Sequence, residues 1–396
     1  MLFSGGGACL AIAALALARP WSQGRQPQRL AEEARELARA GRFQEADHRL
    51  KALLRQCKPD PSVHLIQAQV AAGLGETDRA IAALREIPDD DPLGPLARLS
   101  EGQLEARRGR LRPAEAAFLA TLRILPECVP ARRELVYIYS VQQRIELLDE
   151  QLTGLSSSSA LDRKHLIHWG MVRHSSWSAA ADLPALRRYT AADPHDRYSR
   201  LALTDALIRI GQLEEAATAI APFPESDPDA AALRARIAEA RHDTAELERI
   251  LNAGATDHPG LAALRGRRAL ANRDAVSAAE HFRRVLRLRP HDRAALAGLA
   301  AAQAMAGEKL ESERSFAKLR EIDALGALLA RAEAAQDQLE PSLARELGLA
   351  CLNLGRHAEA EAWLRQTIGL NPADAEAQRL LARLSASSPP ARSRSE

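Results

Sequence analysis

Three histidines near the middle of the chain, His165, His168 and His174, have the side-chain type that could carry metal chemistry. Imidazole nitrogens bind zinc and related metals, and a spacing of three would bring His165 and His168 to one face of a helix. No carboxylate or cysteine at a matching spacing completes a ligand set. We therefore expect surface and groove histidines, with no metal and no cofactor, and keep a metal-binding accessory role as an alternative.

The other reactive residue types form no catalytic set. The four cysteines are scattered without a close pair, which gives neither a metal spacing nor a disulfide framework: Cys9, Cys57, Cys128 and Cys351. A glycine-rich phosphate loop and a G-x-S-x-G nucleophile motif are both missing from the sequence. The sequence thus predicts that the protein is not an enzyme and takes no small-molecule substrate.

The composition indicates helices and argues against nucleic acid. The chain is 46% hydrophobic but only 4% aromatic, and alanine and leucine, both strong helix formers, supply most of the apolar residues. The formal charge is +2, from 54 Lys and Arg against 52 Asp and Glu. Without a long basic block, nucleic acid is not an expected partner. An RNA-binding helical-repeat protein remains an alternative, since such proteins also stack helical pairs.

A repeat of 34 residues runs along the chain, which at 396 residues is too long for one hydrophobic core. The period is set by Gly41, Gly75, Gly109 and Gly211, by Ala46, Ala80, Ala114 and Ala216, and by Pro92, Pro126, Pro194 and Pro228. Units start at 27, 61, 95, 129, 163 and 197. A shortened hairpin follows over about 229–258, then units at 259 and 293, an extra helical stretch over about 323–339, and a last unit at 341. A capping helix is expected over 373–384.

Each repeated position has a physical purpose. Position 8 of the unit is small where the first helix crosses the second, and position 15 is glycine in six of nine full units because the turn needs a left-handed residue. Position 20 is usually alanine, at the closest approach of the paired helices. Position 24 is apolar in every unit and predicts a continuous core: Leu50, Leu84, Phe118, Leu152, Leu186, Ile220, Phe282, Phe316 and Leu364.

The unit that begins at Pro341 carries this pattern as Gly348, Gly355, Ala360 and Pro372, and the unit at Pro259 carries it as Gly266, Ala278, Phe282 and Pro290. The pattern resembles the tetratricopeptide repeat family over residues 27–384. The resemblance implies an all-α solenoid, a right-handed superhelix of about ten helical hairpins with a terminal capping helix. Its first half would span 29–228, and its second half, with the capping helix, 229–384.

The pattern lapses over residues 129–196, where position 15 is Gln143 and Trp177 and position 20 is Leu148 and Asp182. By the family's geometry the first helices of this aromatic and histidine-rich region line a concave groove. We expect that groove to bind a partner through Arg133, Tyr137, Lys164, His168, Met171, His174, Tyr198, Asp205 and Arg209. The alternative is that the large aromatic side chains only fill gaps left by degenerate repeats.

Residues 1–19 form an apolar N-terminal segment without charge from Leu2 to Ala18. Trp21 and the arginines at 19, 25 and 29 favour an uncleaved membrane anchor. An A-x-A sequence ending at Ala18 allows cleavage instead, which would make the chain secreted or periplasmic. Residues 20–28 are a predicted linker and residues 385–396 a predicted disordered tail.

Together these features predict a non-catalytic scaffold at the cell envelope that binds another protein or peptide and contacts the membrane only through its N-terminal segment. The Lys and Asn pairs with which the family grips acidic C-terminal peptides are missing. The matching positions are Ala31 and Arg35, Leu65 and Gln69, and Leu99 and Gln103. A chaperone-tail adaptor is therefore not expected.

Overall fold

The computed structural model describes residues 25–157, 161–173, 179–253, 258–335 and 338–387, and every regular element within them is a helix. The chain divides into two compact units. Unit 1 comprises residues 1–138 and 188–196, and unit 2 comprises residues 139–187 and 197–396. The boundary drawn from the sequence at 228/229 lies inside unit 2.

In the part of unit 1 that the structure describes, there are six complete helices: α1 (Arg25–Arg39), α2 (Phe43–Leu54), α3 (Pro61–Gly73), α4 (Thr77–Arg85), α5 (Gly94–Arg107) and α6 (Leu111–Ile124). Two helices are divided between the units: α7 (Val129–Val141) and α10 (Ala179–Ala192). Within unit 1, α1 packs on α2, α3 on α4, and α5 on α6.

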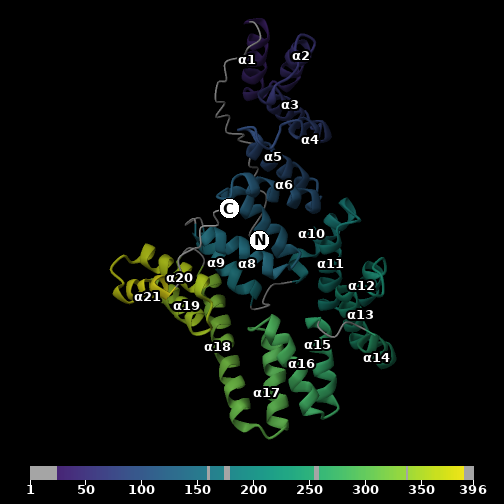
Figure 1. Ribbon diagram of the computed structural model, residues 1–396, viewed down its shortest axis with the longest axis vertical. Coiled ribbons are helices and arrows are strands. Elements are labelled where there is room, and N and C mark those ends of the chain that lie inside the picture. The colour runs from purple at the N-terminus through teal and green to yellow at the C-terminus, as the bar shows by residue number, and fades with distance from the viewer. Residues whose placement is uncertain (1–24, 158–160, 174–178, 254–257, 336–337, 388–396) are drawn as a thin grey trace. The chain divides into compact units, whose positions relative to one another are not determined.

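Unit 2 holds the remaining helices, which are α8 (Ile145–Ser157), α9 (Arg163–Arg173), α11 (Arg197–Arg209), α12 (Leu213–Ile220), α13 (Pro228–Ala240), α14 (Thr244–Ala253), α15 (Pro259–Ala271), α16 (Ala275–Leu288), α17 (Arg293–Met305), α18 (Lys309–Ala334), α19 (Pro341–Asn353), α20 (His357–Leu370) and α21 (Ala375–Ser387). Pairs such as α15 with α16 and α19 with α20 pack as antiparallel hairpins (Figure 1). Eight consecutive pairs of the described helices pack on each other, from α1 with α2 to α5 with α6 and from α11 with α12 to α19 with α20, and α21 follows the last pair. The predicted all-α solenoid with a capping helix is confirmed.

In the hairpins whose turns the structure describes, the turn is built on a left-handed residue. All six glycines of position 15 have positive φ, between 70° and 80°. Two units without glycine keep the same geometry, since Gln143 has a φ of 55° and Arg273 a φ of 59°, and His242 of the short hairpin has a φ of 58°. A residue with a Cβ is strained there by about 1–2 kcal/mol. The packing of the paired helices therefore imposes this turn even where glycine is absent.

The small residue at position 8 makes room for the apolar residue at position 24 of the paired helix. A Cβ at Gly102 would lie 2.5 Å from the Phe118 ring, and one at Gly266 would lie 2.8 Å from the Phe282 ring. Phe118 is fully buried, and Phe282 is 2% exposed. The predicted core stripe is confirmed wherever this pair of positions meets.

Phe316 is the exception to that stripe, because it is 39% exposed. The predicted extra helix over 323–339 does not form separately but continues α18 to Ala334. The next hairpin packs on α18, whose buried apolar residues, Ile322, Leu325, Leu329 and Ala332, all lie in its second half. In the first half no apolar residue is buried, and Phe316 is exposed there, so the assignment of Phe316 to the core was wrong.

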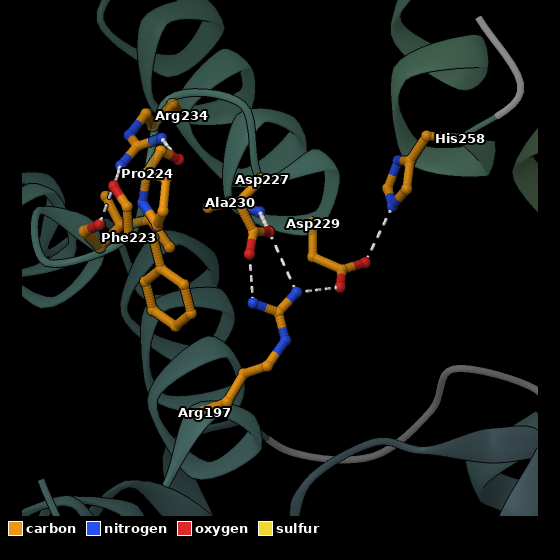
Figure 2. A network of polar contacts seen from close by, with 9 residues as sticks. Arg197, Phe223, Pro224, Asp227, Asp229, Ala230, Arg234 and His258 are labelled. Carbon is orange, nitrogen blue, oxygen red and sulfur yellow. Dashed lines mark hydrogen bonds and ion pairs between the residues drawn. The ribbon is translucent and has the colours of Figure 1, made fainter. Parts of the chain in front are cut away.

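Charged residues at the helix starts tie successive hairpins together (Figure 2). Arg197 on α11 binds Asp227, the N-cap of α13, and its Nη2 lies 2.6 Å from Asp229 Oδ2. His258 caps α15 by accepting the Leu261 N–H at Nδ1, so its Nε2 donates to Asp229 Oδ1 at 3.0 Å. The His258 hydrogen bond lowers the pKa of Asp229 to about 2, although burial opposes the shift.

Arg234 of α13 makes a second tie in the same region. Its guanidinium donates to the carbonyl oxygens that end α12 and its turn, at 3.2 Å to Ile220, 2.5 Å to Phe223 and 3.0 Å to Pro224 (Figure 2). A cation at a helix C-terminus satisfies carbonyl groups that lack partners within the helix. The angle between the α11–α12 and α13–α14 hairpins is thus held from both ends.

Unit 2 also contains contacts that a simple stack of hairpins does not predict. Helix α9 packs on α18 and α20, and α8 packs on α20 (Figure 1). A Cβ at Gly170 of α9 would collide with the Leu329 side chain of α18. Arg365 Nη1 of α20 donates to the Ser156 carbonyl at 3.1 Å, across 209 residues of sequence. Unit 2 is therefore not a stack in which each hairpin contacts only its neighbours, because α8 and α9 have a second set of partners.

The ends of the chain lie mostly outside the described residues, including the whole predicted segment 1–19. Helix α1 begins at Arg25, inside the predicted linker 20–28, and α21 continues to Ser387, inside the predicted tail 385–396. Within the described ranges, no helix has both the length and the apolar character needed to cross a membrane.

Candidate functional site

Unit 2 contains a cavity of about 660 Å³ formed mainly by the ends of helices. Its walls come from one face of α8, the end of α9, Arg209 at the end of α11, the turn between α16 and α17, Ile322 of α18, and the turn between α19 and α20. The packing of α8 and α9 against α18 and α20 brings several of these segments together. A cavity of this size can enclose several side chains of a ligand.

Asp149 of α8 organises one wall of the cavity. Its Oδ1 accepts the Trp169 indole N–H at 2.7 Å and the Arg173 Nε–H at 2.8 Å, while its Oδ2 lies 2.5 Å from Arg173 Nη2. The Arg173 guanidinium also lies over the Trp169 ring, 5.5 Å from its centroid. This two-point contact fixes the direction of Arg173.

Glu359 of α20 receives the other side of Arg173, at 2.7 Å between Oε1 and Nη1. The carboxylate is 2% exposed. Burial raises the pKa of Glu359, and the charges of Arg356 and Arg173 oppose this shift. Cys351 lies beside the pair, with Sγ 3.6 Å from Glu359 Oε2, and burial raises the pKa of its thiol. The network Asp149–Arg173–Glu359 therefore joins α8, α9 and α20 through two half-buried charges and one fully buried carboxylate.

His291 lies in the turn between α16 and α17, on another wall. Its Nε2 is 2.7 Å from the carbonyl oxygen of Leu354, in the turn between α19 and α20. Burial lowers the pKa of His291, the hydrogen bond to Leu354 opposes this shift, and the charges of Arg356, Lys318 and Arg173 add to it. The neutral imidazole thus links two helix-joining turns across the cavity wall.

Unit 1 has a cavity of its own, about 760 Å³, lined by residues of both charges from α4 to α6 and by Ala192 and Asp193. Its charges pair with one another: Arg110 Nε lies 2.6 Å from Glu105 Oε2, and Arg112 Nε lies 3.1 Å from Asp193 Oδ2. Apart from Glu86, the charged residues that line this cavity are paired within the protein.

The predicted groove residues do not all belong to one unit. Arg133 and Tyr137 lie in unit 1, where Arg133 is exposed and the Tyr137 hydroxyl bonds to the Tyr189 hydroxyl. The other described members lie in unit 2, and His174 lies outside the described residues. Only Arg209 lines the 660 Å³ cavity. Whether the set binds a partner stays a prediction.

Within unit 2, the predicted groove residues differ in burial. Lys164 is exposed and Met171 is half-buried. Tyr198 is 39% exposed, and its ring lies 3.9 Å beneath the Arg144 guanidinium. Asp205 is taken up by an ion pair with Arg236.

His168 is almost fully buried rather than open to a groove. Its Nε2 lies 2.6 Å from Ser140 Oγ. Burial lowers the pKa of His168 to about 4, with a smaller contribution from the charge of His165. His165 Nδ1 lies 2.7 Å from Asp162 Oδ1, at the start of α9. Among the described side chains, no three potential metal ligands come together, and His174 lies outside them.

The residues of the buried network could not be identified from the sequence. Arg173, Glu359 and Arg356 occupy ordinary charged positions of the repeat, and only their contacts across unit 2 make them unusual. One signal was present, since α8 and α9 fall within the degenerate stretch 129–196. The lapse in the repeat pattern indicates which helices have a second set of partners. It does not indicate which residues of α18 and α20 contact those helices.

Part of the chain matches a known repeat family. Residues 32–95, 67–127 and 322–375 match a family model described as tetratricopeptide repeat. A search of curated proteins gives no match. The family model confirms the resemblance indicated by the repeat positions.

Several solved structures are similar. A tetratricopeptide repeat protein from Parabacteroides merdae is 12% identical, with 82% of this chain and 98% of that chain covered and a TM-score of 0.28. The Cut9–Hcn1 hetero-tetramer of the APC/C is 14% identical, with 91% and 84% covered and a TM-score of 0.33. YrrB, a repeat protein with an unusual peptide-binding site, is 15% identical, with 55% and 97% covered and a TM-score of 0.22.

Replacing Arg173 by methionine is expected to destabilise unit 2 by about 3–5 kcal/mol, because Glu359 keeps its buried charge and loses its closest cation. Adding Glu359→Met should recover most of the loss, since the uncompensated charge is removed. Denaturant unfolding of the wild type, the Arg173→Met variant and the Arg173→Met/Glu359→Met double variant measures both effects.

The exposed pair Arg267–Glu239, 2.7 Å apart, is the matched control for this experiment. Arg267→Gln is expected to cost less than about 1 kcal/mol. An Arg173→Met protein as stable as the Arg267→Gln protein would show that the buried network does not hold unit 2 together.

The stability of unit 2 is expected to fall between pH 7 and pH 5 because of His168. Its pKa is about 4 in the folded protein, against an ordinary value near 6.5, so the unfolded chain binds a proton in this range and the folded chain does not. The loss is about 2 kcal/mol at pH 5. Urea unfolding at several pH values, compared with His168→Gln, measures the difference; parallel pH curves for the two proteins would contradict it.

Proposed function

Because this chain carries tetratricopeptide repeats, a class of repeat that generally mediates protein–protein interaction, we propose that it is a non-catalytic scaffold that holds a segment of another protein in the cavity of unit 2. The observation that supports this proposal is the convergence of helix ends from distant hairpins around one space of about 660 Å³. Peptide segments bind in concave sites where several elements supply side chains.

The walls of the cavity suit a protein segment better than a reaction. Arg173, Asp149 and Glu359 hold one another, so their charges position the helices rather than face a reacting group. Rims built from helix ends and turns offer both apolar surface, such as exposed Leu288, and polar groups. This mixture is typical of a surface that recognises part of a protein.

The proposal extends to location: residues 1–19 attach the chain to a membrane at the cell envelope. The support is the uncharged, apolar character of this segment followed by arginines and Trp21. An attached scaffold would concentrate its partner at that surface.

Filling the cavity should abolish partner binding. Thr153 of α8 is exposed and lines the cavity, so Thr153→Trp adds bulk there without disturbing the core. The full-length protein is purified from its native cells, and the proteins that co-purify with it are identified by mass spectrometry. We expect the Thr153→Trp variant to lose specific partners that co-purify with the wild type. Thr218→Trp, at an exposed position of α12 away from the cavity, should keep them. The same set of partners with both variants would refute the cavity as the binding site.

The full chain is expected in the membrane fraction, and a chain lacking residues 1–19 in the soluble fraction. Cell fractionation with salt and detergent extraction measures this, because an inserted anchor needs detergent while a peripheral protein is released by salt. If the two chains are distributed equally between the fractions, the proposal that residues 1–19 anchor the protein is refuted. An N-terminus beginning near residue 19 in the purified protein would indicate cleavage instead.

A further inference from the structure

The hairpin α15–α16 carries a positive charge that the balance of the whole chain conceals. Residues 259–289 contain eight arginines but only two acidic residues, Asp274 and Glu280, in a chain whose formal charge is +2. The two preceding hairpins have the opposite balance, since residues 197–253 contain seven arginines and ten acidic residues. Positive charge is therefore concentrated on one hairpin of unit 2.

The positive groups of this hairpin lie close enough to repel one another. Burial lowers the pKa of Arg265, and the charge of Arg284 adds to the shift. Burial also lowers the pKa of His281, and the charges of Arg284 and Arg265 act in the same direction, against Glu280 and Asp274. The two acidic residues of the hairpin thus do not cancel its positive potential.

Three arginines present this charge to solvent along α16. Arg273 lies in the turn before the helix, Arg283 and Arg287 lie one helical turn apart on it, and all three are exposed. Val276 lies seven residues before Arg283 and so on the same side of the helix. Arg273 and Arg287 make no ion pair among the described residues. We call Arg273, Val276, Arg283 and Arg287 the basic face of α16.

The most exposed large apolar side chains of the described residues lie on or beside this face. They are Val276 at 68%, Leu288 at 58% and Leu310 at 56% exposed. Leu310 begins α18 two residues after Glu308, whose Oε2 lies 3.6 Å from Arg283 Nη2, and α17, which leads to that turn, packs beside α16 (Figure 1). Arginines among exposed apolar side chains are typical of a surface that lies at the boundary between lipid headgroups and acyl chains.

Nucleic acid matches the same surface less well. Proteins that bind single-stranded RNA stack its bases on exposed aromatic side chains. The one Phe, Tyr or Trp of residues 259–289 is Phe282, which is 2% exposed in the core of the hairpin. Exposed Val276 and Leu310 gain nothing beside a phosphate backbone, whereas a lipid surface accepts both the arginines and the apolar side chains.

From these observations we infer that the basic face of α16 binds an anionic lipid surface, with its arginines against the lipid phosphates and Val276 and Leu310 at the edge of the acyl chains. This is a membrane contact in addition to the N-terminal segment, to which the sequence had limited membrane contact. The inference does not rest on the proposed function, because neither residues 1–19 nor the interior of the cavity takes part.

The probe is a set of vesicles of phosphatidylcholine alone or with about 30% phosphatidylglycerol, and flotation of the full chain gives its partition constant for each. Residues 1–19 are present in every variant, so the ratio of the two constants, compared between variants, reports the basic face. We expect the wild type to favour the anionic vesicles about 100-fold or more, since each arginine near such a surface contributes about fivefold. About 0.5 M salt should remove most of this preference.

Arg273→Gln/Arg287→Gln should lower the ratio about 25-fold, because two of the three arginines are lost. Both side chains are exposed, and Gln143 already adopts the left-handed turn that Arg273 occupies, so we expect this variant to fold. The matched control is Arg379→Gln/Arg383→Gln, which removes two exposed arginines one turn apart on α21. The control should keep the wild-type ratio within about twofold.

A wild-type ratio near one, or an equal fall of the ratio in the α16 variant and the α21 control, overturns the inference. Labelled oligouridylate provides a second arm. If the RNA binds the wild type and loses affinity with Arg273→Gln/Arg287→Gln, while the vesicles show no preference for anionic lipid, the face binds nucleic acid and the inference is wrong.

Residue-level protection gives a readout that the N-terminal segment cannot supply. Phenylglyoxal modifies accessible arginines, and mass spectrometry locates the modified sites in the full chain. We expect anionic vesicles to protect Arg273 and Arg287 but not Arg379 and Arg383. Equal modification of all four with and without vesicles overturns the inference. Thr153→Trp, which tests the proposed function, should show the wild-type ratio and protection, so the two outcomes are separable.

Discussion

The ion pair between Arg173 and Glu359 is the contact on which the arrangement of unit 2 depends. Glu359 is almost completely withdrawn from water, and a carboxylate is tolerated there only where cations compensate for its lost hydration. Arg173 does this from α9 and is itself held by Asp149 of α8. Asp149 and Arg173 pair where α8 meets α9, and Arg173 reaches Glu359 only where α9 also meets α20.

This requirement changes the character of the repeat array. In a simple stack each hairpin contacts its neighbours, and stability is close to a sum of local terms. Helices α8 and α9 instead contact both their own hairpins and α18 and α20. Residues with two sets of partners cannot keep the repeat pattern, which accounts for fully buried Leu148 at a position where alanine is usual and for Trp169 bonded to Asp149. The cavity exists because the same contact encloses the space between helix ends.

Much of the fold follows from local rules that are visible in the sequence. Glycine at position 15 predicted the left-handed turns, and Gln143 and Arg273 show that the hairpin imposes this geometry even on other residues. The pairing of positions 8 and 24 was predictable because two helices can approach closely only where one side chain is small. The exposure of Phe316 was not predictable, since it depends on how far α18 continues before the next hairpin covers it.

The amino-acid sequence by itself determined the helices, their pairing and the turns between them, because these depend on residues within one 34-residue unit. The tertiary structure alone decided which charged residues became buried partners and where a cavity formed. Arg173 and Glu359 are ordinary charged residues in the sequence, on helices that belong to different parts of the array. Their contact arises from the cumulative angle of many hairpins, and small differences at each junction add up to positions that no local pattern specifies.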